Sequence, residues 1–385
     1  MKTLLNASQL LENTRKLSTE VLAKNADDND QRRSFPRANI ERLGEAGLLG
    51  LLVPKEFGGA GGGVAEMAEA LELMAQACAS TAMVMLMHYC GTAVMAAKAS
   101  DKLKRELLPQ IAAGKHLTTL AFSEAGSGGH FYTPVSEPKL NARAAHLNAR
   151  KNFVTSASEA DSYVVSTRRP GASGPTDLNL YLVRKGANGL NVERQYEGLG
   201  LAANDSAAMR MEEVVLTDDE RLGDPGTGFQ TMLEVVLPHF QLGSAAVSLG
   251  IASAAFAAAT AHVSQRKYEQ AGGVALSAIP RVQYLEAEMA LELRAARAYL
   301  ENAIQKAISG HPEAMLDILA IKIKSSDAAL AIVSRAMTLG GGAAYGRRGG
   351  LERIFRDAQA AAVMAPSSDV LKDFLGKAVL GLPLF

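Results

Sequence analysis

The spacing of apolar residues changes character twice along this chain of 385 residues, and this restricts its fold more than any other feature. Up to about residue 118, apolar residues recur at intervals of three and four, as in AEMAEALELMAQACASTAMVMLMHYCGTAVMAAKA, which indicates helices. From His116 to about residue 222, the runs become short and rich in β-forming residues, as in SYVVSTR and LNLYLVRK. Helical spacing then returns at Gly228. We therefore predict an α+β protein with an N-terminal all-α domain (1–118), a middle antiparallel β domain (119–225) and a C-terminal helical domain (226–385).

The composition limits the classes of function. Basic and acidic residues balance at 40 each, which argues against nucleic acid as a partner, because neutralising phosphates requires a basic excess. The only two cysteines, Cys78 and Cys90, exclude a disulfide scaffold and favour a reducing, cytoplasmic location. We see no signal peptide and no charge-free apolar stretch of about 20 residues, so no membrane span is expected. The nearest candidate, residues 242–262, is predicted to be a buried helix.

Four short stretches place glycine, hydroxyl or charged residues at the ends of predicted elements. LAFSEAGSGGHFYTP (120–134) is a strand end with a glycine turn, which either cradles an anion or a ring edge or is simply a turn. ARKNFVTSASEADSYVVS (149–166) is expected to be a strand end and hairpin. SQRKYEQAGG (264–273) ends a helix with basic residues, as the helix dipole favours, and MTLGGGAAYGRRGGLERIFRDAQ (337–359) ends another in three glycines. Taken singly, none of these stretches decides a function.

Their order along the chain, however, resembles that of the acyl-CoA dehydrogenase superfamily. The resemblance begins at about residue 35 and also includes LLVPKEFGGAGGG and GLGLAANDSAAMRMEEVVL. It implies a flavoprotein in which FAD lies between a middle β-barrel or sandwich domain and a C-terminal four-helix bundle. It also implies a homotetramer, an acyl-CoA or similar small-molecule substrate, and an electron-transfer flavoprotein as partner.

The resemblance further implies which residues contact the cofactor. Phe122 and Ser123 match the family's contacts to one edge of the flavin ring, and Phe153 would cover a ring face. Arg266 matches an arginine that binds the pyrophosphate of a neighbouring subunit's flavin, which suits the bidentate guanidinium group. Met337 stands where the family often has glutamine. The full set is Phe122, Ser123, Gly126, Ser127, Phe153, Thr155, Arg266, Met337, Gly340, Gly341, Ser367 and Asp369.

The catalytic base is the point at which this sequence departs from the family. Dehydrogenation of an acyl thioester needs a base for the α-proton while a hydride leaves the β-carbon for the flavin. The family's usual glutamate falls on Ala365, in VMAPSSDVL, and the position that some members use instead falls at about Phe240. Neither residue can accept a proton. His88 and His239 are the remaining candidates, each of which also fits a purely structural role. No His/Cys cluster has metal-ligand spacing, so no metal is expected.

Three functions therefore stay open. The first is a flavin-dependent oxidoreductase that oxidises an acyl thioester at a CH–CH bond, with Ala365 in place of the usual base. The second is a two-component monooxygenase of the same fold, which takes reduced FAD or FMN from a flavin reductase and uses oxygen. The third is a homologue that binds acyl-CoA or flavin without catalysis.

Overall fold

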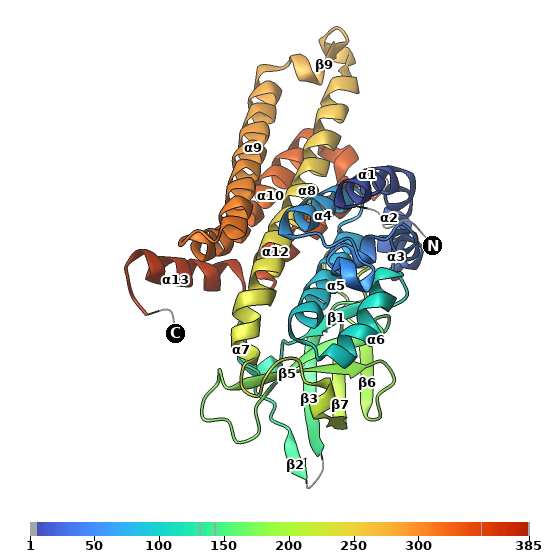
Figure 1. Ribbon diagram of the computed structural model, residues 1–385. Coiled ribbons are helices and arrows are strands. Elements are labelled where there is room, and N and C mark those ends of the chain that lie inside the picture. The colour runs from blue at the N-terminus through green and yellow to red at the C-terminus, as the bar shows by residue number, and fades with distance from the viewer. Residues whose placement is uncertain (1–5, 131, 142–143, 348, 384–385) are drawn as a thin grey trace.

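The computed structural model describes residues 6–130, 132–141, 144–347 and 349–383. N-terminal helices and a β domain lie beside a long C-terminal helical bundle (Figure 1). The N-terminal region contains α1 (Ala7–Leu17), α2 (Ala23–Arg32), α3 (Arg37–Glu45), α4 (Val64–Ala77), α5 (Ala79–Lys98) and α6 (Asp101–Ala112). A π-helical turn, Ser18–Leu22, joins α1 to α2. The side chains of Asn6 and Ser100 cap α1 and α6, because each accepts a hydrogen bond from a first-turn N–H group.

The middle region is a sandwich of two open sheets, not a closed barrel. One sheet has the order β1-β4-β5 and the other the order β2-β3-β7-β6. Inward-facing residues of both sheets, such as Tyr163, Val183, Leu147 and Met209, form one apolar core. The strands are β1 (Thr118–Ala121), β2 (Lys139–Asn141), β3 (Ala144–Val154), β4 (Ser162–Arg168), β5 (Leu178–Arg184), β6 (Leu190–Gln195) and β7 (Ala207–Leu216).

One strand pair corrects the expectation of a wholly antiparallel domain, because β1 and β4 run parallel. After β1 the chain enters the other sheet through β2 and β3 and then returns, so no hairpin forces the two strands into opposite directions. The β1-β4-β5 sheet is also buried on both faces, since Leu120, Val164 and Leu180 join the core of the helical regions. This burial holds the end of β1 firmly between the β domain and the helices.

The C-terminal region is the predicted helical bundle. Its long members are α8 (Leu237–Gln265), α9 (Pro280–Ser309) and α10 (Ala314–Tyr345), and α8 packs against α9, α10 and the N-terminal α4 and α5. Gly250 permits the close approach of α4, because a Cβ atom at this position would lie 2.5 Å from the carbonyl oxygen of Glu72. The shorter segments are α7 (Gly228–Thr231), a π-helical turn (Met232–Val236), β8 (Lys267–Tyr268), β9 (Val274–Ala275), α11 (Leu351–Ala358), α12 (Ala360–Val363) and α13 (Ser368–Val379).

Within the described residues, two helices are long and apolar enough to cross a membrane by length and composition alone. They are α5 and the continuous helix Gly228–Gln265. In their most apolar windows, 89% and 72% of the residues lie buried inside the protein, so both helices pack within its core.

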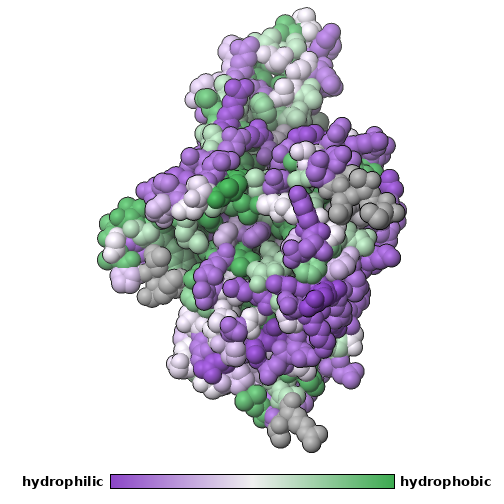
Figure 2. All heavy atoms as spheres, in the orientation of Figure 1, coloured by the Kyte–Doolittle hydropathy of each residue, from purple (hydrophilic) through white to green (hydrophobic). Residues whose placement is uncertain are grey.

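Hydrophilic side chains cover most of the face shown in Figure 2, and hydrophobic ones gather along the middle of the molecule and near α13. Past the end of α13, Leu380 and Leu382 are 73% and 52% exposed. The two cysteines, Cys78 and Cys90, are buried and free, as a fold without disulfides requires.

Candidate active site

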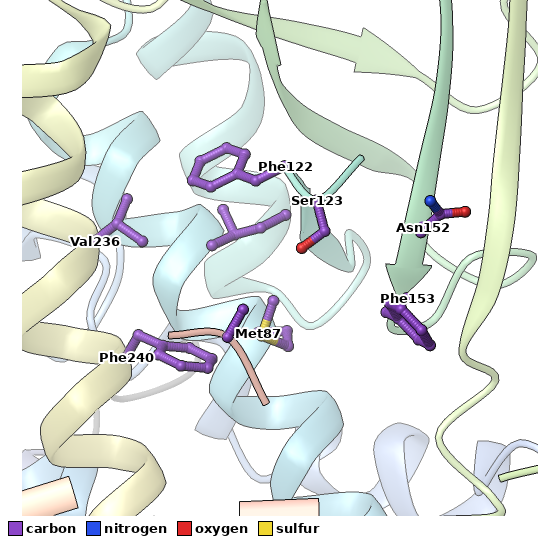
Figure 3. A pocket seen from close by; sticks show the side chains of 9 residues that line it. Met87, Phe122, Ser123, Asn152, Phe153, Val236 and Phe240 are labelled. Atoms are coloured by element: carbon purple, nitrogen blue, oxygen red, sulfur yellow. The ribbon is translucent and has the colours of Figure 1, made fainter. Parts of the chain in front are cut away.

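A cleft opens where the three regions of the chain meet (Figure 3). The cleft is shallow: its cavity volume is about 60 Å³, below the range of about 300–1,000 Å³ typical of small-molecule sites, and it opens to solvent. Its lining comes from α5, the ends of β1 and β3, the start of α8 and the loop before α13. The lining residues are Met87, Leu120, Phe122, Ser123, Asn152, Phe153, Val236, Phe240 and Ala365.

The β-domain wall of the cleft follows directly from β1. Phe122 is buried and Ser123 is half-buried, and both were predicted flavin contacts. The turn that follows holds two further predicted residues: Gly126 is exposed, whereas Ser127 is buried and donates from its hydroxyl to the carbonyl oxygen of Glu124 over 2.8 Å. The predicted contacts of this turn therefore depend on how Glu124 is held.

Glu124 belongs to a buried ion pair behind the cleft wall. Its Oε1 atom lies 2.6 Å from Nζ of Lys151, which also donates to the carbonyl oxygen of Ser166 over 2.5 Å. The other carboxylate oxygen accepts from the backbone N–H groups of Val135 and Ser136 at 2.8 and 2.9 Å. Burial alone would raise the pKa of Glu124, but the Lys151 ammonium group and these hydrogen bonds hold the pKa below its ordinary value. The charged pair fixes both ends of the glycine turn.

Phe153 presents an aromatic ring at the mouth of the cleft. Its φ of 53° is unusual for a bulky residue, and its side chain is 69% exposed. The ring lies 4.8 Å from that of Tyr196, at an angle of 31° between the planes. The Tyr196 hydroxyl donates to Oδ1 of Asn152 over 3.0 Å, which anchors the pair. Strained backbone of this kind is concentrated at functional sites, and the uncovered ring can stack on a planar group. Thr155, two residues on, is buried.

The loop between α12 and α13 forms the opposite wall. The hydroxyl of Ser367 accepts from the N–H group of Val370 over 3.4 Å and so caps α13, while Asp369 lies exposed in the first turn. The hydroxyl of Ser368 is buried and has no hydrogen-bond partner among the described residues. The loop also adjoins the glycine turn, because a Cβ atom at Gly129 would lie 3.3 Å from Cγ2 of Val370.

Both positions at which the sequence predicts the family's base line the cleft, and both are apolar. Ala365 comes from the loop before α13. Phe240 comes from the first turns of α8 (Figure 3). Met87, Leu120, Phe122 and Val236 make most of the remaining wall apolar. Within the described part of the chain, no ionisable side chain lines the cleft.

His88 is a core residue, and the structure argues against its predicted role as a base. The ring is fully buried, with Nε2 2.9 Å from the carbonyl oxygen of Leu49 and Nδ1 accepting from the N–H group of Thr118 over 3.2 Å. Burial lowers the pKa of His88 to about 4. Because both nitrogens are occupied, the neutral imidazole joins the N-terminal helices to β1.

His239 lies beside the cleft without lining it. Its Nδ1 is 2.7 Å from the carbonyl oxygen of Val235, one turn back along the helix, which assigns the proton to Nδ1 and leaves the lone pair on Nε2. Burial lowers the pKa of His239, so the ring is neutral at neutral pH. A neutral imidazole next to Phe240 retains the ability to accept a proton.

The remaining predicted residues lie away from this cleft within one chain. Arg266 is exposed at the end of α8, and Met337 and Gly340 lie near the end of α10. Gly341, with φ of 54°, breaks the helical path of α10. Sequence reasoning did not identify Met87, Leu120, Asn152 or Val236, because apolar residues in a helix or strand have the same pattern in a core as in a cleft. Of these four residues, only Asn152 could have been suspected from the sequence, because it is a polar residue between Lys151 and Phe153.

Comparison with known families accounts for nearly the whole chain. The model of the acyl-CoA dehydrogenase N-terminal domain matches residues 6–115, that of the middle domain residues 119–214, and that of the C-terminal domain residues 226–380. The fold and this cleft thus define an oxidoreductase of the acyl-CoA dehydrogenase class. The chain belongs to the acyl-CoA dehydrogenase family.

Individual relatives agree with this assignment. The chain is 27% identical over 373 residues to a probable acyl-CoA dehydrogenase, fadE25, of Mycobacterium leprae, covering 97% of this chain and 95% of the relative. The butyryl-CoA dehydrogenase of Megasphaera elsdenii superposes with a TM-score of 0.91 at 23% identity, covering 99% of this chain and 100% of that one. PigA with FAD and proline superposes with a TM-score of 0.90 at 21% identity, covering 99% and 100%. The last two likenesses concern the fold alone.

Proposed function

We propose that the protein is an FAD-dependent oxidoreductase that oxidises an acyl thioester, or a similar substrate, at a CH–CH bond. One observation carries the proposal: residues predicted to meet the flavin edge (Phe122, Ser123) and the two family base positions (Ala365, Phe240) line a single cleft. These residues come from parts of the chain more than a hundred residues apart. Family membership supports the same class of reaction.

The cleft is too small to enclose a flavin ring, but its lining offers groups suited to the edge and one face of such a ring. Its walls are mainly apolar, Phe153 leaves 69% of its side chain uncovered, and the Ser123 hydroxyl offers a hydrogen-bonding group at the edge. Phe122 and Ser123 would hold the ring edge, and Phe153 would stack on its face. Bound FAD supplies the acceptor for the substrate hydride. In the proposed homotetramer, Arg266 of a neighbouring subunit would hold the pyrophosphate, with an electron-transfer flavoprotein as electron acceptor.

The chain must also remove the α-proton without a carboxylate. Ala365 and Phe240 bind and shape the substrate region but accept no proton. His239 is the proposed base: its Nδ1–H group donates to the carbonyl oxygen of Val235, which leaves the lone pair of Nε2 to accept the proton. The lowered pKa of His239 keeps that lone pair free at neutral pH.

A test of the proposed reaction uses the FAD-loaded protein under anaerobic conditions. Addition of acyl-CoA thioesters of increasing chain length is expected to bleach the visible flavin absorbance with at least one of them. The variant His239→Gln, which keeps a side-chain N–H donor but cannot act as a base, is expected to retain FAD and lose bleaching. Failure of every acyl-CoA to bleach a stably FAD-loaded protein contradicts the proposed reaction.

A second candidate, a two-component flavin monooxygenase, is favoured by the absence of ionisable side chains from the described lining of the cleft. This protein would take reduced FAD or FMN from a partner reductase. Weak flavin retention, with oxygen uptake only after a flavin reductase and its reductant are added, supports it. A protein that binds neither oxidised nor reduced flavin would instead be a homologue without catalysis.

Replacement of Ala365 by glutamate is expected to restore a base at the cleft. Because Ala365 already lines the cleft, the new carboxylate would face the bound substrate, and a positioned base contributes a factor of about 10²–10⁴ in rate. Steady-state acyl-CoA oxidation by A365E should therefore exceed that of the unaltered protein by about 10²-fold. Val363→Glu, at a site 74% exposed on α12, is the matched control and should gain nothing. A well-folded A365E variant without any gain would indicate that thioesters do not enter the cleft.

A further inference from the structure

Lys322 is a buried cation directly behind the loop that carries Ala365. It lies on α10, and its side chain is fully buried. Its Nζ atom donates to the carbonyl oxygen of Met364 over 2.8 Å and to that of Pro366 over 2.7 Å. No carboxylate of the described residues forms an ion pair with it, and burial lowers its pKa to about 7.

A buried lysine amino group without a counter-charge costs free energy unless hydrogen bonds satisfy it, so its presence needs a structural reason. The two carbonyl groups supply one. They flank a single residue, Ala365, at a point where α12 has ended and α13 has not begun, so no helix satisfies them. Pro366 has no N–H group, which removes one donor that a turn would otherwise use. Lys322 therefore donates hydrogen bonds to two carbonyl groups that have no donor within the loop itself.

The same loop touches both sides of the cleft. Ala365 itself lines the cleft. Ser367 and Val370 lie next to the glycine turn of the β domain, since a Cβ atom at Gly129 would be 3.9 Å from Oγ of Ser367 and 3.3 Å from Cγ2 of Val370. A shift of the loop would displace the wall at Ala365 and its contact with the turn together.

We propose that Lys322 is a positioning residue for the cleft, whose Nζ group clamps the backbone on both sides of Ala365 and so fixes the wall that faces the β domain. The proposal rests on the proposed function in taking this cleft as the flavin site. Lys322 does not line the cleft and acts through the loop alone. Its role is to hold the loop in one conformation before any ligand binds.

The test compares Lys322→Met with Lys324→Met in the full-length protein. Lys324 lies on the same helix but is partly exposed and pairs with Glu292 over 2.6 Å, so it controls for loss of a lysine from α10. Hydrogen exchange of residues 363–369 in the FAD-free protein is expected to accelerate about tenfold or more in Lys322→Met, and not in Lys324→Met. The Kd for FAD, measured by fluorescence titration, is expected to rise about tenfold in Lys322→Met alone.

The outcomes separate this proposal from the proposed function. Unchanged exchange in the loop, or faster exchange spread evenly over the bundle, overturns the role of Lys322. If the loop exchanges faster in Lys322→Met but the unaltered protein does not bind FAD, the proposed function is overturned and the role of Lys322 in holding the loop stands. If Lys322→Met fails to fold, Lys322→Gln replaces it, because glutamine keeps N–H donors without the charge. We expect hydrogen exchange of residues 363–369 to accelerate in this variant too, by a smaller factor. Exchange at the rate of the unaltered protein would count against the role of Lys322.

Discussion

Replacement of Lys151 by methionine is expected to lower the free energy of unfolding by about 3–5 kcal/mol, because it leaves the buried Glu124 carboxylate without its counter-charge. Both side chains of this pair are almost completely buried, so solvent cannot take over the lost interaction. Urea unfolding followed by circular dichroism measures the effect. The same loss should loosen the turn at Gly126 and Ser127, since Glu124 holds the backbone of Val135 and Ser136.

Two further variants isolate the cause. The double variant Lys151→Met with Glu124→Gln is expected to recover part of the stability, because it removes both charges from the interior. Lys102→Met is the surface control: Lys102 pairs with Asp219 over 2.8 Å, but both side chains are more than 70% exposed, so the loss should stay below about 1 kcal/mol. A cost for Lys151→Met as small as that of the control would mean that the pair does not hold the turn.

His88 is expected to make the protein sensitive to acid. Its pKa is lowered from 6.5 to about 4 by burial, so between these values the unfolded chain binds a proton that the folded protein excludes. The associated stability is complete above pH 6.5 and is lost as the pH falls toward 4, up to about 3 kcal/mol for a shift of this size. Unfolding free energies measured at pH 7 and at pH 4 give the difference.

The variant His88→Gln should reduce this pH dependence by about that amount, although it will be less stable at neutral pH. His239, whose pKa burial also lowers, remains in the variant and cancels in the comparison. His116 does not cancel fully, because its charge also lowers the pKa of His88. Tyr89→Phe is the matched control, because it removes a neighbouring buried hydrogen bond, to the carbonyl oxygen of Leu48, without removing a group that titrates here. An equal pH slope in the unaltered protein and in His88→Gln would contradict the interpretation.

Local patterns predicted much of the architecture correctly. The change from helical to β spacing at His116 and back at Gly228 agrees with β1 beginning at Thr118 and α7 at Gly228. Pro366 and Ser367 end one helix and begin the next, as proline and an N-cap serine do in any context. The order of motifs placed Phe122, Phe153 and Ala365 at one site, and all three line the cleft.

Other features depend on partners that lie far away in the sequence. The parallel pairing of β1 with β4 arises because the intervening chain visits another sheet. His88 lies in a run of apolar helical residues, and both of its ring nitrogens form hydrogen bonds with the backbone of Leu49 and Thr118. No local pattern could predict these partners.

Lys322 shows most clearly which features the sequence determines and which depend on the tertiary structure. In AIKIKSSDAA the sequence presents two lysines two residues apart on one helix. The sequence by itself determined that this segment is a helix and that Ala365 cannot act as a base. Only the tertiary structure decided that Lys324 meets Glu292 at the surface while Lys322 is buried against the carbonyl groups beside Ala365. The physical reason is that periodicity records which residues are apolar, whereas the partner of a buried polar group is set by a segment that packing brings alongside it.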